Sequence, residues 1–234
     1  MPARRGSTRL KDKLLLPVKN KPVIAWTVEN ALKVGYPVVV VCDDEEFKKV
    51  LSDYPVEVIL TPSNLKSGSD RIAYTLKNLD YDVVVNLQGD EPTIHPQDVK
   101  KIFQTLEQDQ VATLSYQIEN EEDYINPNVV KVITDKNGYA LYFSRSPIPF
   151  YRDIDFSQML KILKPQKHIG VYGYHKDVLL EFSFNLKPSP LEEVEKLEQL
   201  RLLYNGYKIK VIQASKDSIG IDTKEDYERF CSLI

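Results

Sequence analysis

Asp90 is the residue whose position in this sequence best suits it for chemistry. It follows the apolar run at residues 83–87 and stands between Gly89 and the Glu91-Pro92 pair. A short apolar run that ends in turn residues predicts a buried strand. In an open α/β sheet, ligands bind beyond the carboxyl ends of the strands, so a carboxylate at this point would face a binding site. The alternative is a strand-end turn in which Asp90 only caps the backbone, and this segment alone favours neither.

A second carboxylate and a basic loop could share a site with Asp90. Asp222 stands directly before a predicted helix, where it would either cap that helix or face a ligand. Residues 2–13 combine Gly6 with hydroxyls, arginines and lysines, which are groups that bind polyphosphates, although the GxxxxGK phosphate-loop pattern is absent. A basic N-terminus without fixed structure is the alternative for this loop. Carboxylate and phosphate oxygens are both ligands of Mg²⁺, so the three features together predict a site for magnesium and a polyphosphate.

Two further segments carry polar side chains that could contact a ligand. Residues 67–71 read Ser-Gly-Ser-Asp-Arg before a predicted helix, which is also the composition of an ordinary N-cap. His168 precedes a predicted strand at residues 169–174, in which two glycines would leave room for a ligand beside tyrosine hydroxyls. His95 and His175 lack such surroundings, and a histidine taken alone is more often structural than functional.

The first half of the sequence alternates predicted helices with apolar strands. Helices are expected at residues 22–34, 69–79 and 97–107, with a short helix after Asp43 or Asp44, and strands at residues 38–42, 56–60 and 83–87. Alternation of this kind predicts an α/β domain with a mostly parallel sheet and helices on both faces. Asp90 would then end a parallel strand.

The pattern changes in the middle of the chain. Residues 111–118 alternate apolar with polar side chains, and the segments at 129–134 and 139–144 flank Asn137-Gly138, which predicts a β-hairpin. We therefore expect an antiparallel lobe at about residues 111–175. The lobe would lie within a single domain that spans residues 1–234.

The end of the chain returns to helix and strand signals. Ser189-Pro190-Leu191-Glu192 is typical of a capped helix start, and a stripe of leucines predicts one helix that continues to Gly206. A strand is expected at residues 208–214. Thr223 is expected to cap the last helix.

Composition restricts the classes of function. The chain has 234 residues, 42% of them hydrophobic, and a net charge of −3, so no basic surface for nucleic acid is predicted. No apolar run reaches transmembrane length, so no membrane span is expected. The only two cysteines, Cys42 and Cys231, do not form a disulfide framework, which favours a reducing cytoplasm.

Eight segments together resemble one family, the 3-deoxy-D-manno-octulosonate cytidylyltransferases, also called CMP-Kdo synthetases. They occur in the order typical of the family over nearly the whole chain, and each is weak alone. The segments are Pro2-Ala3-Arg4 with Gly6-Ser7-Thr8-Arg9-Leu10, Asn20-Lys21-Pro22, Ser67-Gly68-Ser69-Asp70-Arg71, Gln88-Gly89-Asp90-Glu91-Pro92, Gly138-Tyr139-Ala140-Leu141-Tyr142-Phe143-Ser144-Arg145, His168-Ile169-Gly170-Val171-Tyr172-Gly173-Tyr174, Leu197-Glu198-Gln199-Leu200-Arg201 and Gly220-Ile221-Asp222-Thr223.

The resemblance implies a nucleotidyltransferase-type domain that uses Mg²⁺ to transfer CMP from CTP to the acid sugar Kdo, releasing pyrophosphate and activating Kdo for lipopolysaccharide synthesis. It also implies a homodimer formed through the antiparallel lobe. Carried over by position, the nucleotide-binding residues would be Arg4, Ser7, Thr8, Arg9, Lys13, Ser67, Ser69 and Arg71, with Arg9, Lys13 and Asp90 catalytic. Asp90 and Asp222 would bind Mg²⁺, and the residues around Kdo would be Gln88, Arg145, His168, Tyr172, Glu198 and Gln199. Transfer of this kind needs positioning and charge neutralisation more than a protein nucleophile, and a sugar carboxylate needs an arginine or imidazolium partner.

Two features depart from the family pattern. Lys11-Asp12-Lys13-Leu14 replaces its usual Pro-Gly-Lys-Pro, and the apolar strand that precedes Pro-Ala-Arg in relatives has no counterpart before Pro2. We therefore expect the strands next to Pro2 to lack one partner. The alternative functions are a related CMP-sialate synthetase and a nucleotide-binding module without catalysis. The segments around Tyr142 and His168 favour Kdo, and the presence of both aspartates favours catalysis.

Overall fold

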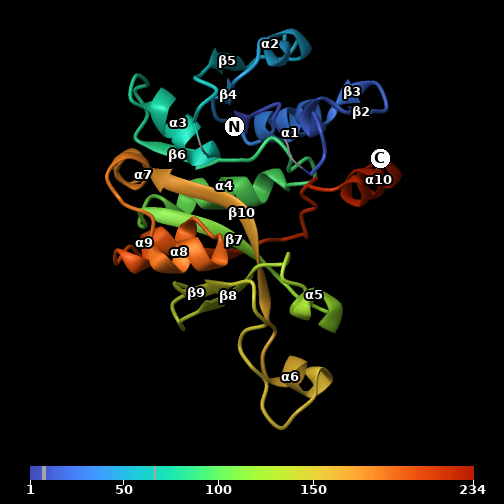
Figure 1. The fold of residues 1–234 in the computed structure, drawn as a ribbon, viewed down its shortest axis with the longest axis vertical. Helices are drawn as coiled ribbons and strands as arrows, with labels where there is room; N and C mark the ends of the chain where they lie inside the picture. Colours follow the sequence, from blue (N-terminus) through green and yellow to red (C-terminus); the bar gives the residue numbers. More distant parts are fainter. Residues whose placement is uncertain (7–8, 66) are drawn as a thin grey trace.

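The N-terminal part of the molecule is built on a small parallel sheet. The computed structural model describes residues 1–6, 9–65 and 67–234. Strands β1 (Pro2–Ala3), β4 (Val39–Cys42) and β5 (Glu57–Leu60) pair in the order β1-β4-β5, and both pairs are parallel. The surrounding elements are η1 (Lys13–Leu15), β2 (Pro17–Val18), β3 (Lys21–Pro22), α1 (Val23–Leu32), α2 (Glu46–Val50) and α3 (Gly68–Leu76) (Figure 1).

A larger mixed sheet forms the rest of the fold. Its order is β11-β7-β10-β8-β9, and β6 also pairs with β10. Its strands are β6 (Val83–Asn86), β7 (Val111–Gln117), β8 (Lys131–Thr134), β9 (Ala140–Ser144), β10 (Gln166–His175) and β11 (Lys210–Gln213). β7 and β11 are parallel, whereas β10 is antiparallel to β6, β7 and β8. The α/β class with an antiparallel part is thus confirmed, but β6, the strand before Asp90, pairs antiparallel with β10 and not within the parallel sheet.

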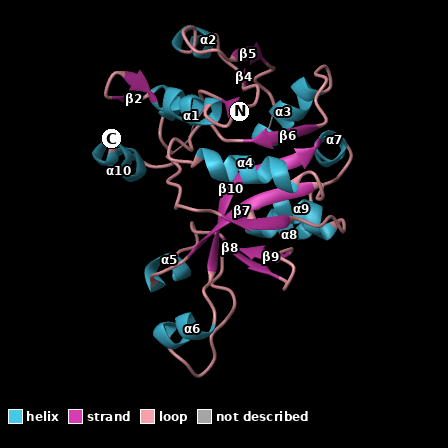
Figure 2. Cartoon of the chain, turned by 180° about the vertical axis from the view of Figure 1, so that it is seen from behind, coloured by secondary structure: helices cyan, strands magenta, loops and turns pink. Residues whose placement is uncertain are grey.

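Helices cover both faces of the larger sheet, as predicted. Side chains of α4 (Pro96–Thr105) pack on one face with Val171, and side chains of α7 (Lys176–Phe184) pack on the other with Tyr172. These two neighbours in β10 point to opposite faces because side chains alternate along a strand. Figure 2 shows α4 in front of β7 and β10. The cavity described below opens on the Tyr172 face.

The predicted single helix after Ser189 is instead two helices. Ser189 and Glu192 form the expected capping box of α8 (Pro190–Glu195), but Lys196 then adopts a left-handed φ of 55° before α9 (Gln199–Tyr204). The predicted apolar stripe fails because Val194 is 84% exposed. The side chain of Arg145 donates hydrogen bonds to the carbonyls of Glu195 and Lys196, and these contacts compete with helical hydrogen bonds.

The predicted hairpin is confirmed and begins a distal lobe. β8 and β9 pair antiparallel, and Gly138 takes the positive φ of 80° that the turn requires. The short helices α5 (Glu121–Ile125) and α6 (Phe156–Ile162) complete the lobe, which extends away from the rest of the molecule in Figure 1. Thr223 and Asp226 form the capping box of the terminal helix α10 (Lys224–Leu233), also as expected. Among the described residues, no helix has the length and apolar character needed to cross a membrane.

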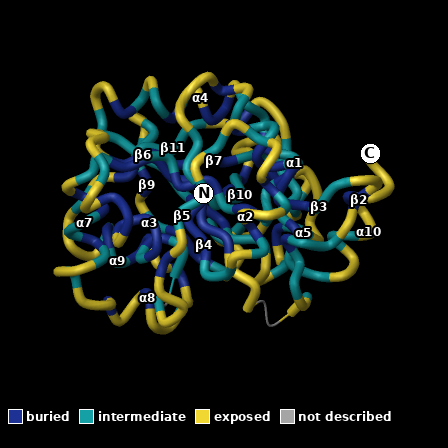
Figure 3. Tube along the Cα trace, turned by 90° about the horizontal axis from the view of Figure 1, so that it is seen from above, coloured by how far each residue is buried: buried dark blue, intermediate teal, exposed yellow. Residues whose placement is uncertain are grey.

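An apolar groove of about 270 Å³ lies beside β1, between β4 and β6. The Met1 amino group donates to the carbonyl oxygen of Val39 at 2.7 Å, and burial lowers the pKa of this amine to about 5. The start of the chain is surrounded by buried segments (Figure 3). The groove is lined by valines from both strands together with Ile72, Leu76 and Phe103.

A short apolar extension before Met1 should raise the thermal unfolding midpoint by several degrees. The extension would replace a buried amine with an amide and would supply hydrogen-bond partners to strand edges, each buried group gaining about 1–3 kcal/mol. Differential scanning calorimetry of the extended chain is the measurement, and a Gly-Ser extension of equal length is the control. Equal midpoints for the two extensions would contradict the expected strand pairing.

Candidate active site

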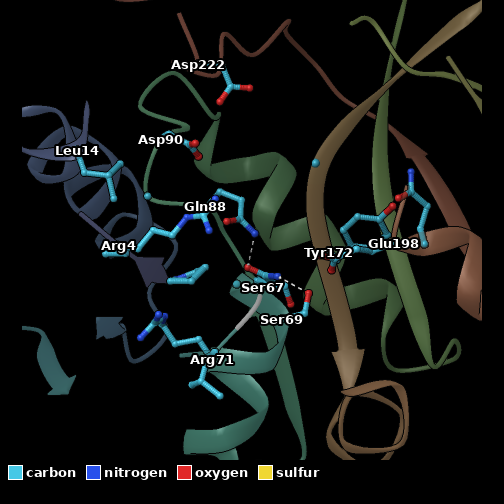
Figure 4. Close-up of a pocket in the computed structure, with 18 of the residues that line it drawn as sticks. Arg4, Leu14, Ser67, Ser69, Arg71, Gln88, Asp90, Tyr172, Glu198 and Asp222 are labelled. Carbon is cyan, nitrogen blue, oxygen red and sulfur yellow. Dashed lines mark hydrogen bonds between the residues drawn. The ribbon is translucent and has the colours of Figure 1, made fainter. Parts of the chain in front are cut away.

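A polar cavity of about 420 Å³ lies where the loops of the parallel sheet face β10. Its lining comes from the β1 loop, η1, the start of α3, the end of β6, β10, the α8–α9 turn and the loop before α10. Figure 4 shows Asp90 and Asp222 at one end, Arg71 at another, and Tyr172 and Glu198 across from Arg4. The predicted site residues that line it are Arg4, Arg9, Lys13, Ser67, Ser69, Arg71, Gln88, Asp90, His168, Tyr172, Glu198, Gln199 and Asp222.

Asp90 and Asp222 converge on one cation. The ammonium group of Lys13 donates to Asp90 Oδ2 and, at 2.8 Å, to Asp222 Oδ1. The guanidinium of Arg9 lies 2.9 Å from the other oxygen of Asp222. These residues are separated by most of the chain, so the fold brings together the basic loop and both carboxylates that the sequence singled out.

Backbone hydrogen bonds fix Asp222 beside Asp90. The amide of Ile221 donates to the carbonyl oxygen of Asp90 at 2.8 Å, and Thr93 Oγ1 accepts from the amide of Ile219 at 2.6 Å. Thr223 supplies the cap of α10, so the side chain of Asp222 is free of that role. The N-cap alternative for Asp222 is therefore wrong.

At residues 67–71 the predicted N-cap is present, because Ser67 Oγ accepts a hydrogen bond from the amide of Asp70 at 3.1 Å. Ser67 also lines the cavity.

Glycine 89 allows the strand end to pack against the start of the chain. A Cβ at this position would lie 3.2 Å from the carbonyl oxygen of Pro2 and 3.2 Å from Leu14. This close approach supports the prediction that Gly89 brings its backbone near another group. It also places η1, which carries Lys13, against Asp90.

The charges at this end of the cavity depend on one another. Burial opposes the charged form of Lys13, but Asp90 and Asp222 outweigh it and raise the pKa of this ammonium. Burial likewise opposes ionisation of Asp222, yet the hydrogen bond and charge of Lys13 hold the pKa of its carboxyl below the usual range. At neutral pH the cluster therefore contains an ionised Asp222 and a charged Lys13.

Two carboxylates with an adjacent phosphate-sized space suit a magnesium ion. Mg²⁺ prefers oxygen ligands and usually combines one or two carboxylates with substrate phosphates and water. Asp90 and Asp222 already bring oxygens within hydrogen-bonding distance of a single charged atom, the Lys13 nitrogen. Among the described residues there is no cluster of three or more acidic, histidine or cysteine ligands, so phosphate and water would have to complete the coordination.

Glu91 is a second carboxyl beside this cluster, and its environment disfavours the charge. Burial and the neighbouring Asp90 raise its pKa to about 7. Its Oε2 accepts from Ser218 Oγ at 2.7 Å. Because the folded-state pKa lies above the usual 4.5, the folded state binds the proton more tightly than the unfolded chain. The free energy of unfolding therefore falls as pH rises from about 4.5 to about 7, because the folded protein must then carry an ionised Glu91. Above pH 7 the free energy of unfolding stays lower by the same amount.

Glu91→Gln should raise the unfolding midpoint at pH 8 by about 3–6 °C in metal-free buffer, with a much smaller change at pH 5. The amide can keep the bond from Ser218 without the buried charge. Thermal unfolding at the two pH values measures the effect, and Glu193→Gln on the exposed face of α8 is the control. A stabilisation of equal size at both pH values would contradict the assigned pKa.

Arg71 and its neighbours form the other end of the cavity. Arg71 is almost fully buried, donates to the Thr61 hydroxyl and lies 3.5 Å from a carboxylate oxygen of Asp43. Gly68 packs against Pro2, since a Cβ there would lie 2.9 Å from its ring. The predicted nucleotide residues Ser7 and Thr8 lie outside the described residues.

The side of the cavity formed by β10 and the α8–α9 turn contains polar groups without protein partners. Among the described residues, the Tyr172 hydroxyl and Gln199 Nε2 are buried and make no hydrogen bond. Gln88 Nε2 donates to Asn86 Oδ1 at 3.0 Å, which leaves its carbonyl oxygen available (Figure 4). Buried polar groups are normally satisfied, so unpartnered ones that line a cavity indicate a polar ligand.

His168 lines the cavity, but not as a cation. Burial lowers its pKa to about 3, so the imidazole is neutral at pH 7. The protein without a ligand therefore does not present the imidazolium that was expected to pair with a sugar carboxylate. Gly170, two residues on, leaves open space as expected. Gly173 instead faces Ile102 of α4 and Leu106 directly after that helix, so it makes room for a helix and not for a ligand.

Arg145 is the one described residue of the predicted set that does not line this cavity. Its Nε donates to the carbonyl oxygen of Glu195 at 2.7 Å and Nη1 to that of Pro127 at 3.1 Å, and Lys196 accepts at 3.4 Å. The guanidinium thus supports the α8–α9 turn and does not face the cavity. The prediction of direct contact with Kdo does not fit this geometry.

Three polar lining residues were not predicted from the sequence: Asn86, Tyr174 and Lys196. Asn86 and Tyr174 could have been found, because each lies in a strand two residues from a predicted site residue, Gln88 or Tyr172. Lys196 could not, because the predicted continuous helix gave no sign of the turn that brings it to the cavity.

Comparisons with known proteins agree with the geometry. A family model described as Cytidylyltransferase matches residues 1–209. The chain is 45% identical to a 3-deoxy-manno-octulosonate cytidylyltransferase from Thermodesulfovibrio yellowstonii, over 97% of this chain and 94% of the relative. It is 43% identical to the enzyme of the same name from Chloroherpeton thalassium, over 100% of this chain and 96% of the relative.

Among solved structures, the chain is similar to CMP:2-keto-3-deoxy-manno-octonic acid synthetase complexed with CTP. The match has a TM-score of 0.91 and 36% sequence identity, and it covers 99% of this chain and 95% of the other.

Proposed function

Because this chain belongs to the cytidylyltransferase family, we propose that it transfers CMP from CTP to Kdo. The relatives that it matches over nearly their full length are 3-deoxy-manno-octulosonate cytidylyltransferases. The anomeric hydroxyl oxygen of Kdo forms a bond to the α-phosphorus of CTP. The bond between the α- and β-phosphates breaks, pyrophosphate leaves, and the hydroxyl proton passes to solvent. The product, CMP-Kdo, is an activated sugar for lipopolysaccharide biosynthesis.

The observation that carries this proposal is the division of one cavity into two chemically different parts. Arg9 and Lys13 contact the aspartates in one part, whereas Tyr172 and Gln199 line the part with unpartnered polar groups. The first part suits a triphosphate, and the second suits a polyhydroxylated acid. Both must be present in one cavity for the sugar oxygen to reach the α-phosphate.

At the phosphate end, the protein supplies charge and position. Arg4 and Arg9 would bind phosphate oxygens, and Lys13 would turn from the carboxylates to the nucleotide when it binds. Asp90 and Asp222 would hold Mg²⁺, which supplies neutralisation of the phosphate charge. Ser67, Ser69 and Arg71 would lie near the base and ribose.

At the sugar end, neutral donors and acceptors predominate. Tyr172, Gln199, Gln88 and Glu198 would bind hydroxyl groups of the sugar. With His168 neutral and Arg145 engaged elsewhere, we propose that Lys196 pairs with the sugar carboxylate, because it is the cation on the turn that also carries Glu198.

Pyrophosphate release with CTP and a panel of acid sugars tests the function. Release is expected with Kdo and Mg²⁺ and not with CTP alone. Preference for sialic acid would favour the related synthetase instead, and CTP binding without release under any condition would favour a non-catalytic module.

We further propose a homodimer formed through the distal lobe, and a cytoplasmic location. The lobe exposes Phe150 at 84% and Ile162 at 78%, which is unusual for large apolar side chains and favours a covered surface. Both cysteines are free in the structure, in keeping with a reducing compartment. Sedimentation equilibrium measures the dimer, and a monomer at micromolar concentration would contradict it.

Arg145→Ala should raise the KM for Kdo by about 10-fold or more and change the KM for CTP by less than about 2-fold. The reason is the loss of hydrogen bonds that hold the turn bearing Lys196, Glu198 and Gln199. Steady-state kinetics with each substrate varied in turn measures the effect. Arg152→Ala, on an exposed arginine of the same lobe, is the control, and equal increases in both KM values would contradict a role limited to the sugar end.

A further inference from the structure

Thr113 is a buried side chain that contacts His168, a residue that lines the cavity. It lies in β7 opposite an irregularity in β10, where the register shifts between Ile169 and Tyr172. Its Oγ1 lies 2.8 Å from the carbonyl oxygen of Val171 and 3.0 Å from Nε2 of His168. One hydroxyl therefore joins the irregular strand to the histidine ring.

The positions of these atoms determine where the protons lie. A threonine hydroxyl has one hydrogen to donate and lone pairs that accept. The carbonyl of Val171 can only accept, so the hydroxyl hydrogen lies on that 2.8 Å contact. The hydroxyl oxygen must then accept from His168, which places the imidazole hydrogen on Nε2.

The second ring nitrogen of His168 is left as an acceptor. Phe143 and Tyr172 hold the ring with centroid distances of 5.1 and 5.2 Å, so its orientation is restricted. Nδ1 has no hydrogen-bond partner within the described part of the chain, and His168 is only partly buried. The cavity that His168 lines is the surface available to it.

We propose that Thr113 is a positioning residue for sugar binding: it holds His168 as the Nε2–H tautomer, so that the bare Nδ1 accepts a hydrogen bond from a hydroxyl group of the acid sugar. The burial that lowers the pKa of His168 to about 3 supports this arrangement, because Nδ1 then stays unprotonated at neutral pH. The identity of the sugar rests on the proposed function; the tautomer does not. Thr113 thus acts through His168 and needs no contact with substrate.

The tautomer can be measured on the unmodified protein without any substrate. Nitrogen-15 NMR of histidine-labelled protein at pH 7, with the His168 signals identified by their loss in His168→Asn, should show a protonated Nε2 and an unprotonated Nδ1. Thr113→Val should change this pattern, and Thr113→Ser should keep it. A protonated Nδ1 or an imidazolium in the unmodified protein would overturn the proposal even if CMP-Kdo forms normally.

Kinetics provides the functional half of the test. Thr113→Val should raise the KM for Kdo about 10-fold, the equivalent of one hydrogen bond, with the KM for CTP and kcat changed by less than about 2-fold. Thr113→Ser should restore the KM. His168→Asn, which can place an amide oxygen near Nδ1, should retain more sugar affinity than His168→Gln. An unchanged KM for Kdo in Thr113→Val, with the protein folded by circular dichroism, would also overturn the proposal.

Discussion

Asp90→Asn is expected to lower turnover with CTP and Kdo by on the order of 10²-fold or more, about 3 kcal/mol. The substitution removes one of the two carboxylates that converge on the Lys13 ammonium, where we propose that Mg²⁺ binds. The phosphate charge that develops during transfer would then be less neutralised. Asp222→Asn should have a similar effect. Mg²⁺-dependent formation of CMP-Kdo is the measurement.

Folding should be nearly unaffected, because both carboxylates lie on loops at the cavity and cap no helix. Asp80→Asn, at an exposed position before the other end of β6, is the matched control and should retain normal turnover. Near-normal activity in either aspartate variant would remove that residue from the metal site. Loss of the thermal transition, instead of activity, would show that the residue stabilises the loop.

The positions of Asp90 and Asp222 could be predicted from the sequence because local patterns mark them. An apolar run that ends in Gln-Gly-Asp and a short Gly-Ile-Asp segment before a capped helix are visible in a few residues each. The same holds for Ser67, whose cap of α3 the sequence indicated. Strand ends, helix caps and the loop residues beside them are determined by a few neighbouring residues, and their predicted positions agree with the structure.

Features set by long-range contacts could not be predicted in this way. An alternation of helices and strands does not distinguish a parallel partner of β6 from the antiparallel partner β10, which lies more than eighty residues further along the chain. The turn between α8 and α9 accepts a hydrogen bond from Arg145, which lies 50 residues earlier in the chain than Glu195. For the same reason, the sequence marked Arg145 as a site residue but could not show that it acts on backbone carbonyls.

Lys13→Met should separate metal binding from catalysis. In the absence of nucleotide, the Lys13 ammonium occupies the space between the carboxylates of Asp90 and Asp222 and so competes with a divalent cation. Removing it should tighten binding of the metal alone by up to about 10-fold, since two partly buried ion pairs no longer oppose it. Turnover should nevertheless fall on the order of 10²-fold, because a cation that stabilises the phosphates is lost.

The opposite signs of these two effects make the test specific. Mn²⁺ binding, followed by electron paramagnetic resonance, measures the first, and CMP-Kdo formation measures the second. Lys11→Met, two residues away on an exposed side chain, controls for the change in net charge and should alter neither. A general disruption of the loop would weaken metal binding and turnover together. Tighter metal binding together with slower turnover is expected only if Lys13 has two roles. It must compete with the metal for the carboxylates before the nucleotide binds, and contact the phosphates afterwards.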